Sequence, residues 1–149
     1  MRVGGSENAT GPLGESVGEW PDHYPESCPP GDADTPAGTC YRLVKKAQIA
    51  ERDFMSYLEL HLKGLRFSGE KPWDDSKDCL AAGLSVHPTK EAADQKRKSS
   101  GGMRRLKIAE GNIDGVGRIA NTSSNSDPHH QTWWVEDGFD PVPLFSVIE

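Results

Sequence analysis

The sequence over residues 83–98 is GLSVHPTKEAADQKRK, and it predicts a short strand followed directly by a helix. Residues 84–87 have strand composition, and Pro88 ends the strand because proline cannot donate a hydrogen bond to a ladder. Thr89 is a favourable N-cap for a helix over 90–98. An acidic residue in the first turn and basic residues in the last turn suit the dipole of that helix. This stretch therefore predicts one strand–helix unit around which the flanking segments are arranged.

The segments before this unit are mainly helical, and those after it resemble strands. Apolar residues recur at helical spacing between residues 50 and 65, which predicts an amphipathic helix there. The other expected elements are a strand over 40–45, a short helix ending at Ala82, and strands over 103–109, 117–122, 131–135 and 144–148. We therefore expect an α+β fold: a small, mostly antiparallel sheet with two or three helices.

The first 38 residues differ in composition from the rest of the chain. They hold seven acidic residues and one basic residue, which accounts for the whole net charge of −6. Gly and Pro make up 13 of these 38 residues, above the roughly 25–30% typical of disordered segments. We expect residues 1–38 to form a disordered acidic tail and residues 39–149 to form a single domain. Removal of the tail should then leave the melting temperature nearly unchanged, and Trp20 and Tyr24 are its only plausible anchors for a partner.

The three cysteines, Cys28, Cys40 and Cys79, cannot form a closed set of disulfides and include no CxxC pair. We interpret them as free thiols in a reducing cytoplasm, without a metal site. No apolar run approaches the roughly 18 residues of a membrane span, and the start of the chain lacks the apolar core of a signal peptide. We expect a cytoplasmic protein with no membrane association.

Nucleic acid is an unlikely partner on grounds of charge. The basic run over 95–98 and the basic residues at 104–107 are local features, because the positive and negative charges of residues 39–149 balance. A nucleic-acid-binding domain usually carries a basic face and a basic total. These residues are more typical of a solvated helix end and a polar strand face.

The most unusual local cluster is His129, His130, Trp133 and Trp134, which we predict to form a ligand-binding surface. An exposed Trp would stack on a base, a sugar or a protein side chain, whereas a buried Trp would fill the core. Neighbouring His residues on an extended segment point to opposite faces, so the two cannot easily bind one metal ion. A nearby carboxylate such as Asp127 would make at most a weak metal site, and we expect no metal.

Three short motifs carry a resemblance: YRLV at 41–44, DFMS at 53–56 and GLSV at 83–86. Their order resembles the layout of small bacterial proteins to which no activity is assigned, over roughly residues 40–98. A fainter resemblance is to ADP-ribosyltransferase-like folds, in which a strand with a Tyr-Arg pair precedes a Gly-hydrophobic-Ser strand and a helix.

The second resemblance implies that Arg42 and Ser85 help to hold NAD and that a later Glu directs the transfer. Arg suits a pyrophosphate, because its planar fork matches phosphate geometry, and a Ser hydroxyl suits a ribose. The late glutamates of this chain are Glu136 and Glu149, and they do not form a Glu-x-Glu pair. Arg42 and Ser85 are therefore the candidate catalytic residues under this alternative.

Two classes of function follow. The first is a non-enzymatic module that binds another protein or a small ligand and needs no cofactor. The alternative is an ADP-ribosyltransferase-like enzyme or toxin that uses NAD. A cleft in which Arg42 and Ser85 converge with a Glu or a His would favour the enzyme.

Overall fold

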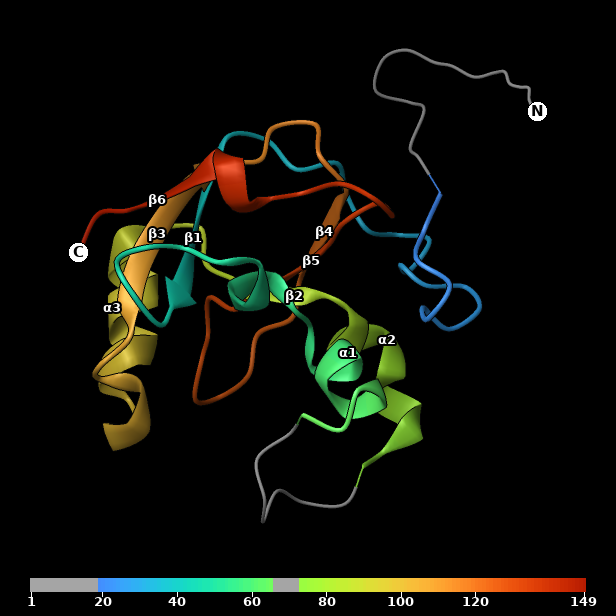
Figure 1. The fold of residues 1–149 in the computed structure, drawn as a ribbon, viewed down its shortest axis with the longest axis horizontal. Helices are drawn as coiled ribbons and strands as arrows, with labels where there is room; N and C mark the ends of the chain where they lie inside the picture. The colour runs from blue at the N-terminus through green and yellow to red at the C-terminus, as the bar shows by residue number, and fades with distance from the viewer. Residues whose placement is uncertain (1–18, 66–72) are drawn as a thin grey trace.

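The structure is a computed structural model that describes residues 19–65 and 73–149. It confirms the α+β class: the strands form two antiparallel sheets, accompanied by short helices (Figure 1). One sheet has the order β1 (Thr39–Val44), β3 (Lys107–Asn112), β6 (Phe145–Val147), and the other β2 (Leu84–Val86), β5 (Gln131–Trp134), β4 (Arg118–Asn121). The α-helices are α1 (Tyr57–Leu62), α2 (Asp78–Ala82) and α3 (Lys90–Lys98), and the 3-10 helices are η2 (Glu51–Phe54), η3 (Asp75–Lys77), η4 (Gly101–Met103) and η5 (Val142–Leu144).

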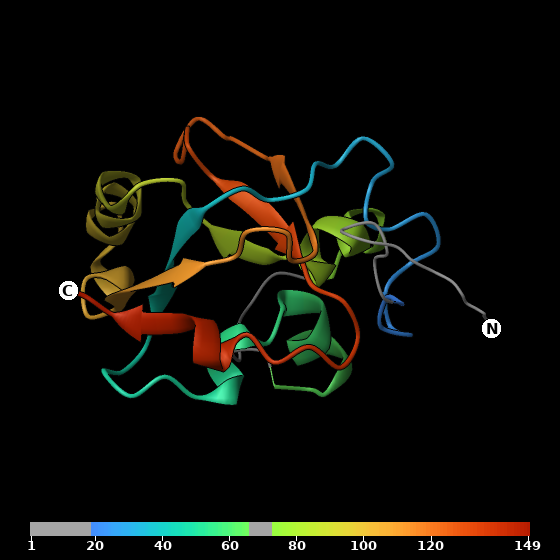
Figure 2. The ribbon, with the colours of Figure 1, turned by 90° about the horizontal axis from the view of Figure 1, so that it is seen from above.

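A single backbone bridge joins the two sheets. Tyr41 in β1 and His87, just after β2, exchange backbone hydrogen bonds of 2.9 and 2.8 Å. β1 is therefore flanked by β3 on one side and by the end of β2 on the other (Figure 2). Helix α3 packs against β1 and β3, whereas α1 and α2 pack against each other. Among the described helices, none has the length and apolar character needed to cross a lipid bilayer.

Strand β5 separates two apolar clusters. Trp133 and Trp134 are both fully buried, and because successive strand residues point to opposite faces, each belongs to a different cluster. The Trp133 indole donates to the carbonyl of Val116 (2.9 Å), and the Trp134 indole donates to that of Cys79 (2.8 Å). Gly83 leaves room for Thr132 and for the second indole, since a Cβ there would overlap the Cγ2 atom of Thr132 and lie 3.1 Å from Nε1 of Trp134. The Trp pair thus holds both cores together.

The prediction of one continuous helix over 50–65 is wrong, because the segment forms two separate helices, η2 and α1. Ser56 is extended and caps α1: its hydroxyl accepts from the backbone N–H of Glu59, whose carboxylate accepts in return from the N–H of Ser56. This capping box favours a new helix start at Ser56 over continuation through it. The buried ring of Phe54 anchors the preceding turn.

Other predicted elements match more closely. Helix α3 spans residues 90–98 as expected, and the Thr89 hydroxyl accepts from the N–H of Ala92. The strand predicted over 103–109 begins later, at Lys107, because the glycines before it form η4. The strands predicted over 40–45, 117–122, 131–135 and 144–148 correspond to β1, β4, β5 and β6.

The predicted tail boundary at residue 38 also needs correction. Residues 1–18 lie outside the described residues, but residues 19–38 pack on the domain. Trp20 and Tyr24 contact the cluster around Trp134, and the Tyr24 hydroxyl lies 3.3 Å from the carbonyl of Val135. Asp34 exchanges two backbone bonds of 2.8 Å with Ile119 in β4. The Gly- and Pro-rich composition of residues 1–38 therefore did not reveal the individual residues that anchor residues 19–38 to the domain.

The cysteines also differ from the prediction of three free thiols. Cys28 and Cys79 form a disulfide across 51 residues of sequence, which ties the N-terminal segment to α2. Cys40 is a free thiol in the core, and burial raises its pKa to about 12. A thiol in this state is a packing group rather than a nucleophile.

We predict that removing residues 1–38 destabilises the domain by about 3 kcal/mol or more, because it deletes buried aromatic contacts and the disulfide. Thermal melts under non-reducing conditions should show a decrease of about 10 °C. A truncation of residues 1–18 is the control, since it keeps every contact described above. Equal melting temperatures for the two truncations would contradict the packing of residues 19–38.

Candidate functional site

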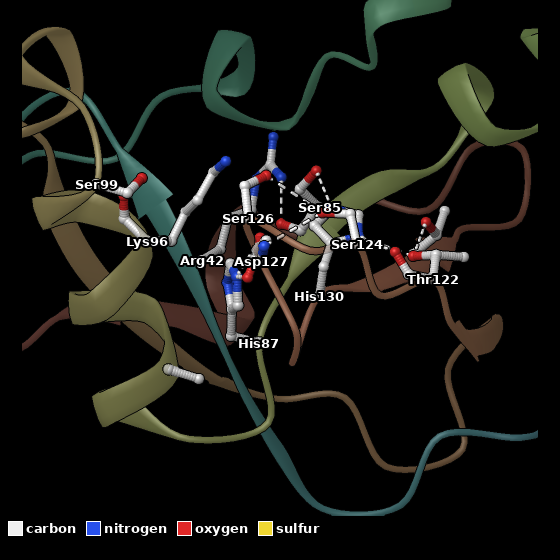
Figure 3. A network of polar contacts seen from close by, with 12 residues as sticks. Arg42, Ser85, His87, Lys96, Ser99, Thr122, Ser124, Ser126, Asp127 and His130 are labelled. Carbon is white, nitrogen blue, oxygen red and sulfur yellow. Dashed lines mark hydrogen bonds and ion pairs between the residues drawn. The ribbon is translucent and has the colours of Figure 1, made fainter.

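A cleft of about 630 Å³ lies beside the bridge between β1 and β2. Its lining combines polar side chains from β1, β2, η2, α3 and the loop between β4 and β5 with apolar side chains from α1, η4 and the residue after η2. We call it the junction cleft. Its polar wall consists of Arg42, Ser85, His87, Lys96, Asp127 and His130, which lie close together (Figure 3).

Arg42 reaches the cleft from β1 through bonds to backbone carbonyls. Its Nε and Nη2 atoms donate to the carbonyl of Asp53 (2.9 and 2.8 Å), and Nη1 donates to the carbonyl of Ser85 (2.7 Å). The guanidinium also lies 5.5 Å from the centroid of the Phe54 ring. Burial lowers its pKa to about 10, so it keeps its positive charge at neutral pH. Of its five N–H donors, three are used by these bonds, and among the described residues no carboxylate forms an ion pair with it.

Ser85 and His130 meet across β2 and the start of β5. The Ser85 hydroxyl lies 2.7 Å from His130 Nε2, and the Ser85 side chain is exposed because its strand neighbours Leu84 and Val86 turn into the core. The other ring nitrogen, Nδ1, lies 2.7 Å from the hydroxyl and 3.2 Å from the carbonyl of Thr122. Burial lowers the pKa of His130 below its ordinary value, partly opposed by the charge of Asp127. The imidazole is therefore neutral at pH 7.

His87 and Asp127 form a buried pair behind this contact. His87 Nε2 lies 3.1 and 3.0 Å from the two carboxylate oxygens of Asp127, and both residues are nearly inaccessible to solvent. The loop between β4 and β5 holds Asp127 in place, since the Asp127 backbone N–H donates to Ser124. The rings of His87 and His130 meet edge to face with centroids 5.9 Å apart. The pair thus fixes the loop that carries His130 against β2.

The cleft has an excess of positive charge. Its lining includes five basic residues, Arg42, Lys45, Lys46, Arg52 and Lys96, and two acidic residues, Asp53 and Asp127. Both carboxylates are engaged: Asp53 accepts from backbone N–H groups of Lys45 and Ala50, and Asp127 holds His87. The site therefore favours a negatively charged ligand.

The structure brings together three of the predicted site residues: Arg42, Ser85 and His130. His129 is exposed and does not line the junction cleft, which follows from the opposite directions of neighbouring strand residues. Trp133 and Trp134 are fully buried, so neither indole is available to stack on a ligand, and both serve the core. The Trp part of the predicted binding surface is therefore corrected to a packing role.

The sequence did not predict His87 and Thr122 as residues of this site, and it indicated Asp127 only as a weak metal ligand. One signal for His87 was present: it lies two residues after Ser85, so the alternation of β2 places both on the same side. The pairing of Asp127 with His87 depends on the shape of a nine-residue loop, which no local pattern in the sequence predicts.

The late glutamates lie elsewhere. Glu136 lines a second cavity of about 710 Å³ between residues 21–24, α1 and the loop over 135–142. Glu149 lies 3.7 Å from the ammonium of Lys90 and 3.5 Å from the guanidinium of Arg97. Across residues 19–65 and 73–149, no group of three His, Cys, Asp or Glu side chains is arranged to hold a metal ion.

Comparisons with known proteins identify no relative of this chain. No protein-family model, no curated protein and no solved structure matches the chain.

We predict that Asp127→Asn destabilises the domain by about 2–3 kcal/mol, because it removes a charged acceptor from a buried hydrogen-bonded pair. Thermal or urea unfolding measures this loss. Ser126→Ala, at the exposed neighbouring position, is the control and should change stability by less than about 0.5 kcal/mol. Equal unfolding of the two variants would show that the pair does not hold the loop.

Proposed function

We propose that the chain binds a small anionic ligand in the junction cleft, where Arg42 holds the negative charge. The observation that carries this proposal is the half-buried guanidinium, which pairs with no carboxylate of the described residues and keeps two N–H donors. A partly buried cation without an ion-pair partner is costly; the nearby charge of Asp53 stabilises Arg42 in part, and an anionic ligand would offset more of that cost. Lys96 adds a second positive charge to the same wall.

The shape of the cleft supports a small ligand over a partner macromolecule. Besides its polar groups, the cleft is lined by the apolar side chains of Met55, Leu60, Met103 and Leu106. A concave site lined by apolar side chains and a few convergent polar groups is typical of small-molecule binding. A ligand with a phosphate or carboxylate at one end and an apolar or aromatic body at the other would fit this arrangement.

A second candidate is NAD-dependent transfer, and the convergence of Arg42, Ser85 and His130 favours it. Arg42 would hold the pyrophosphate and Ser85 a ribose hydroxyl, as the resemblance to ADP-ribosyltransferase-like folds implies. The bond between the ribose C1′ and nicotinamide would break, and an acceptor nucleophile would take the place of nicotinamide. No Glu of the described residues lines the junction cleft, so His130 is the group positioned to take the acceptor's proton.

The bonded cysteines bear on the compartment in which this function operates. The cytoplasmic prediction assumed three free thiols, but Cys28 and Cys79 are joined. Disulfides persist in oxidising compartments and are rare in the cytosol. The bond therefore favours a location outside the reducing cytoplasm.

We predict that NAD, ADP-ribose and inorganic pyrophosphate each raise the melting temperature of the full chain. Saturation at a hundredfold excess over the dissociation constant corresponds to about 2.7 kcal/mol of added stability, which differential scanning fluorimetry detects as a shift of several degrees. Release of free nicotinamide during incubation with NAD, measured by chromatography, would distinguish transfer from binding alone.

Lys96→Gln should reduce the ligand-induced shift, whereas Lys90→Gln should not, because Lys90 lies on the same helix but outside the cleft. High salt should also weaken the shift. Absence of any shift at millimolar concentrations of all three ligands would contradict the proposal.

A further inference from the structure

The contacts around His130 favour one of its two ring nitrogens as the site of the proton. Nδ1 lies 3.2 Å from the backbone carbonyl of Thr122, and a carbonyl oxygen can only accept a hydrogen bond. This contact favours the tautomer whose proton sits on Nδ1; the Thr122 hydroxyl, 2.7 Å from Nδ1, then also accepts and donates to the Thr132 hydroxyl 2.8 Å away. Nε2 is left with a lone pair, so the hydroxyl of Ser85, 2.7 Å away, donates to it. This arrangement is that of a hydroxyl beside an oriented general base.

Three further features suit the Ser85 hydroxyl to a reaction with a bound substrate. Its side chain is exposed at the junction cleft, so that a substrate can reach it. Its carbonyl accepts from the guanidinium of Arg42, which places a positive charge at the same residue. The cleft is also lined by apolar side chains, among them Met55 and Leu60, which suit an acyl or alkyl group.

From this geometry we infer that Ser85 is a nucleophile activated by His130 and that it attacks activated acyl esters. In this step the Oγ–carbon bond forms, the hydroxyl proton passes to His130 Nε2, and Arg42 stabilises the charge on the carbonyl oxygen. The bond to the leaving alcohol then breaks, and that alcohol takes the proton from His130. Water next attacks the acyl group and gives a proton to Nε2, which returns it to Ser85 as the acid leaves.

This activity goes beyond ligand binding and does not depend on NAD. The charged and titratable groups that face His130 are Asp127 from its own loop, His87 from the end of β2 and Lys96 from α3. Asp127 favours the protonated ring, whereas burial, His87 and Lys96 disfavour it, and the net effect lowers the pKa of His130. The base is therefore in its active, neutral form at pH 7.

The chain contains a matched control serine. Ser146 lies at the centre of β6 between two apolar residues, as Ser85 does in β2, and it is likewise exposed. No hydrogen bond from the Ser146 side chain to a His is present in the described part of the chain, so it should react only at the rate of an ordinary serine.

The test is reaction of the full chain with an alkyl fluorophosphonate, followed by intact mass measurement and peptide mapping. The phosphorus–fluorine bond breaks as the bond to Oγ forms, and fluoride and the proton leave. We expect one adduct, on Ser85, whose formation persists in Ser146→Ala and is absent in Ser85→Ala. His130→Gln should lower the labelling rate by about 100-fold or more, since general-base catalysis contributes about 10²–10⁴.

A second measurement on the unaltered protein does not depend on the folding of any variant. The labelling rate should fall on acidification with a midpoint below pH 6.5, because protonation of His130 removes its lone pair. Hydrolysis of p-nitrophenyl butyrate should follow the same pH profile. Equal labelling of Ser85 and Ser146, no labelling at all, or a rate independent of pH from 5 to 8 would overturn the inference. None of these results would affect the anion-binding proposal, which the ligand-induced melting shifts test separately.

Discussion

The burial of two consecutive tryptophans in β5 is the constraint on which the rest of the structure depends. Consecutive strand residues face opposite ways, so burying both indoles requires a core on each side of the strand. Trp133 provides the wall of the core shared with β1, β2 and β6, whereas Trp134 packs with α1, α2 and the N-terminal segment. Each indole N–H must also find an acceptor when buried, and both do.

The same strand places the functional groups. His130 immediately precedes β5, and Thr132 pairs in register with Ser85 of β2, so the buried Trp pair fixes the position from which His130 reaches Ser85. On the other side, the Tyr41–His87 bridge fixes β1 against β2 and brings Arg42 to the carbonyl of Ser85. The site therefore joins Arg42 of β1 and Ser85 of β2 to the loop between β4 and β5, which carries Asp127 and His130.

The sequence predicted much of the fold and part of the site. Local signals were sufficient for α3, where Thr89 and the basic last turn mark both ends, and for the strands of the C-terminal third. They failed between residues 50 and 65, because apolar periodicity does not register the capping box at Ser56. They also failed for residues 19–38, where a few long-range contacts and the Cys28–Cys79 bond outweigh a composition rich in Gly and Pro.

For the site, residue chemistry singled out Arg42, Ser85 and His130, but not their mutual contact. Their convergence depends on strand order, which the sequence does not specify. The buried His87–Asp127 pair could not be predicted for the same reason. Its partners are 40 residues apart in the sequence and meet through the fold of the loop between β4 and β5.

The chemistry inferred for Ser85 depends on a neutral His130 that presents a lone pair to the Ser85 hydroxyl. Nitrogen-15 NMR of the imidazole side chains tests it most directly, with His130 assigned by comparison with His130→Gln among the five histidines. We expect a neutral ring at pH 7 with its proton on Nδ1, and an Nε2 resonance that moves in Ser85→Ala. A proton on Nε2, or a fully protonated ring at pH 7, would contradict it.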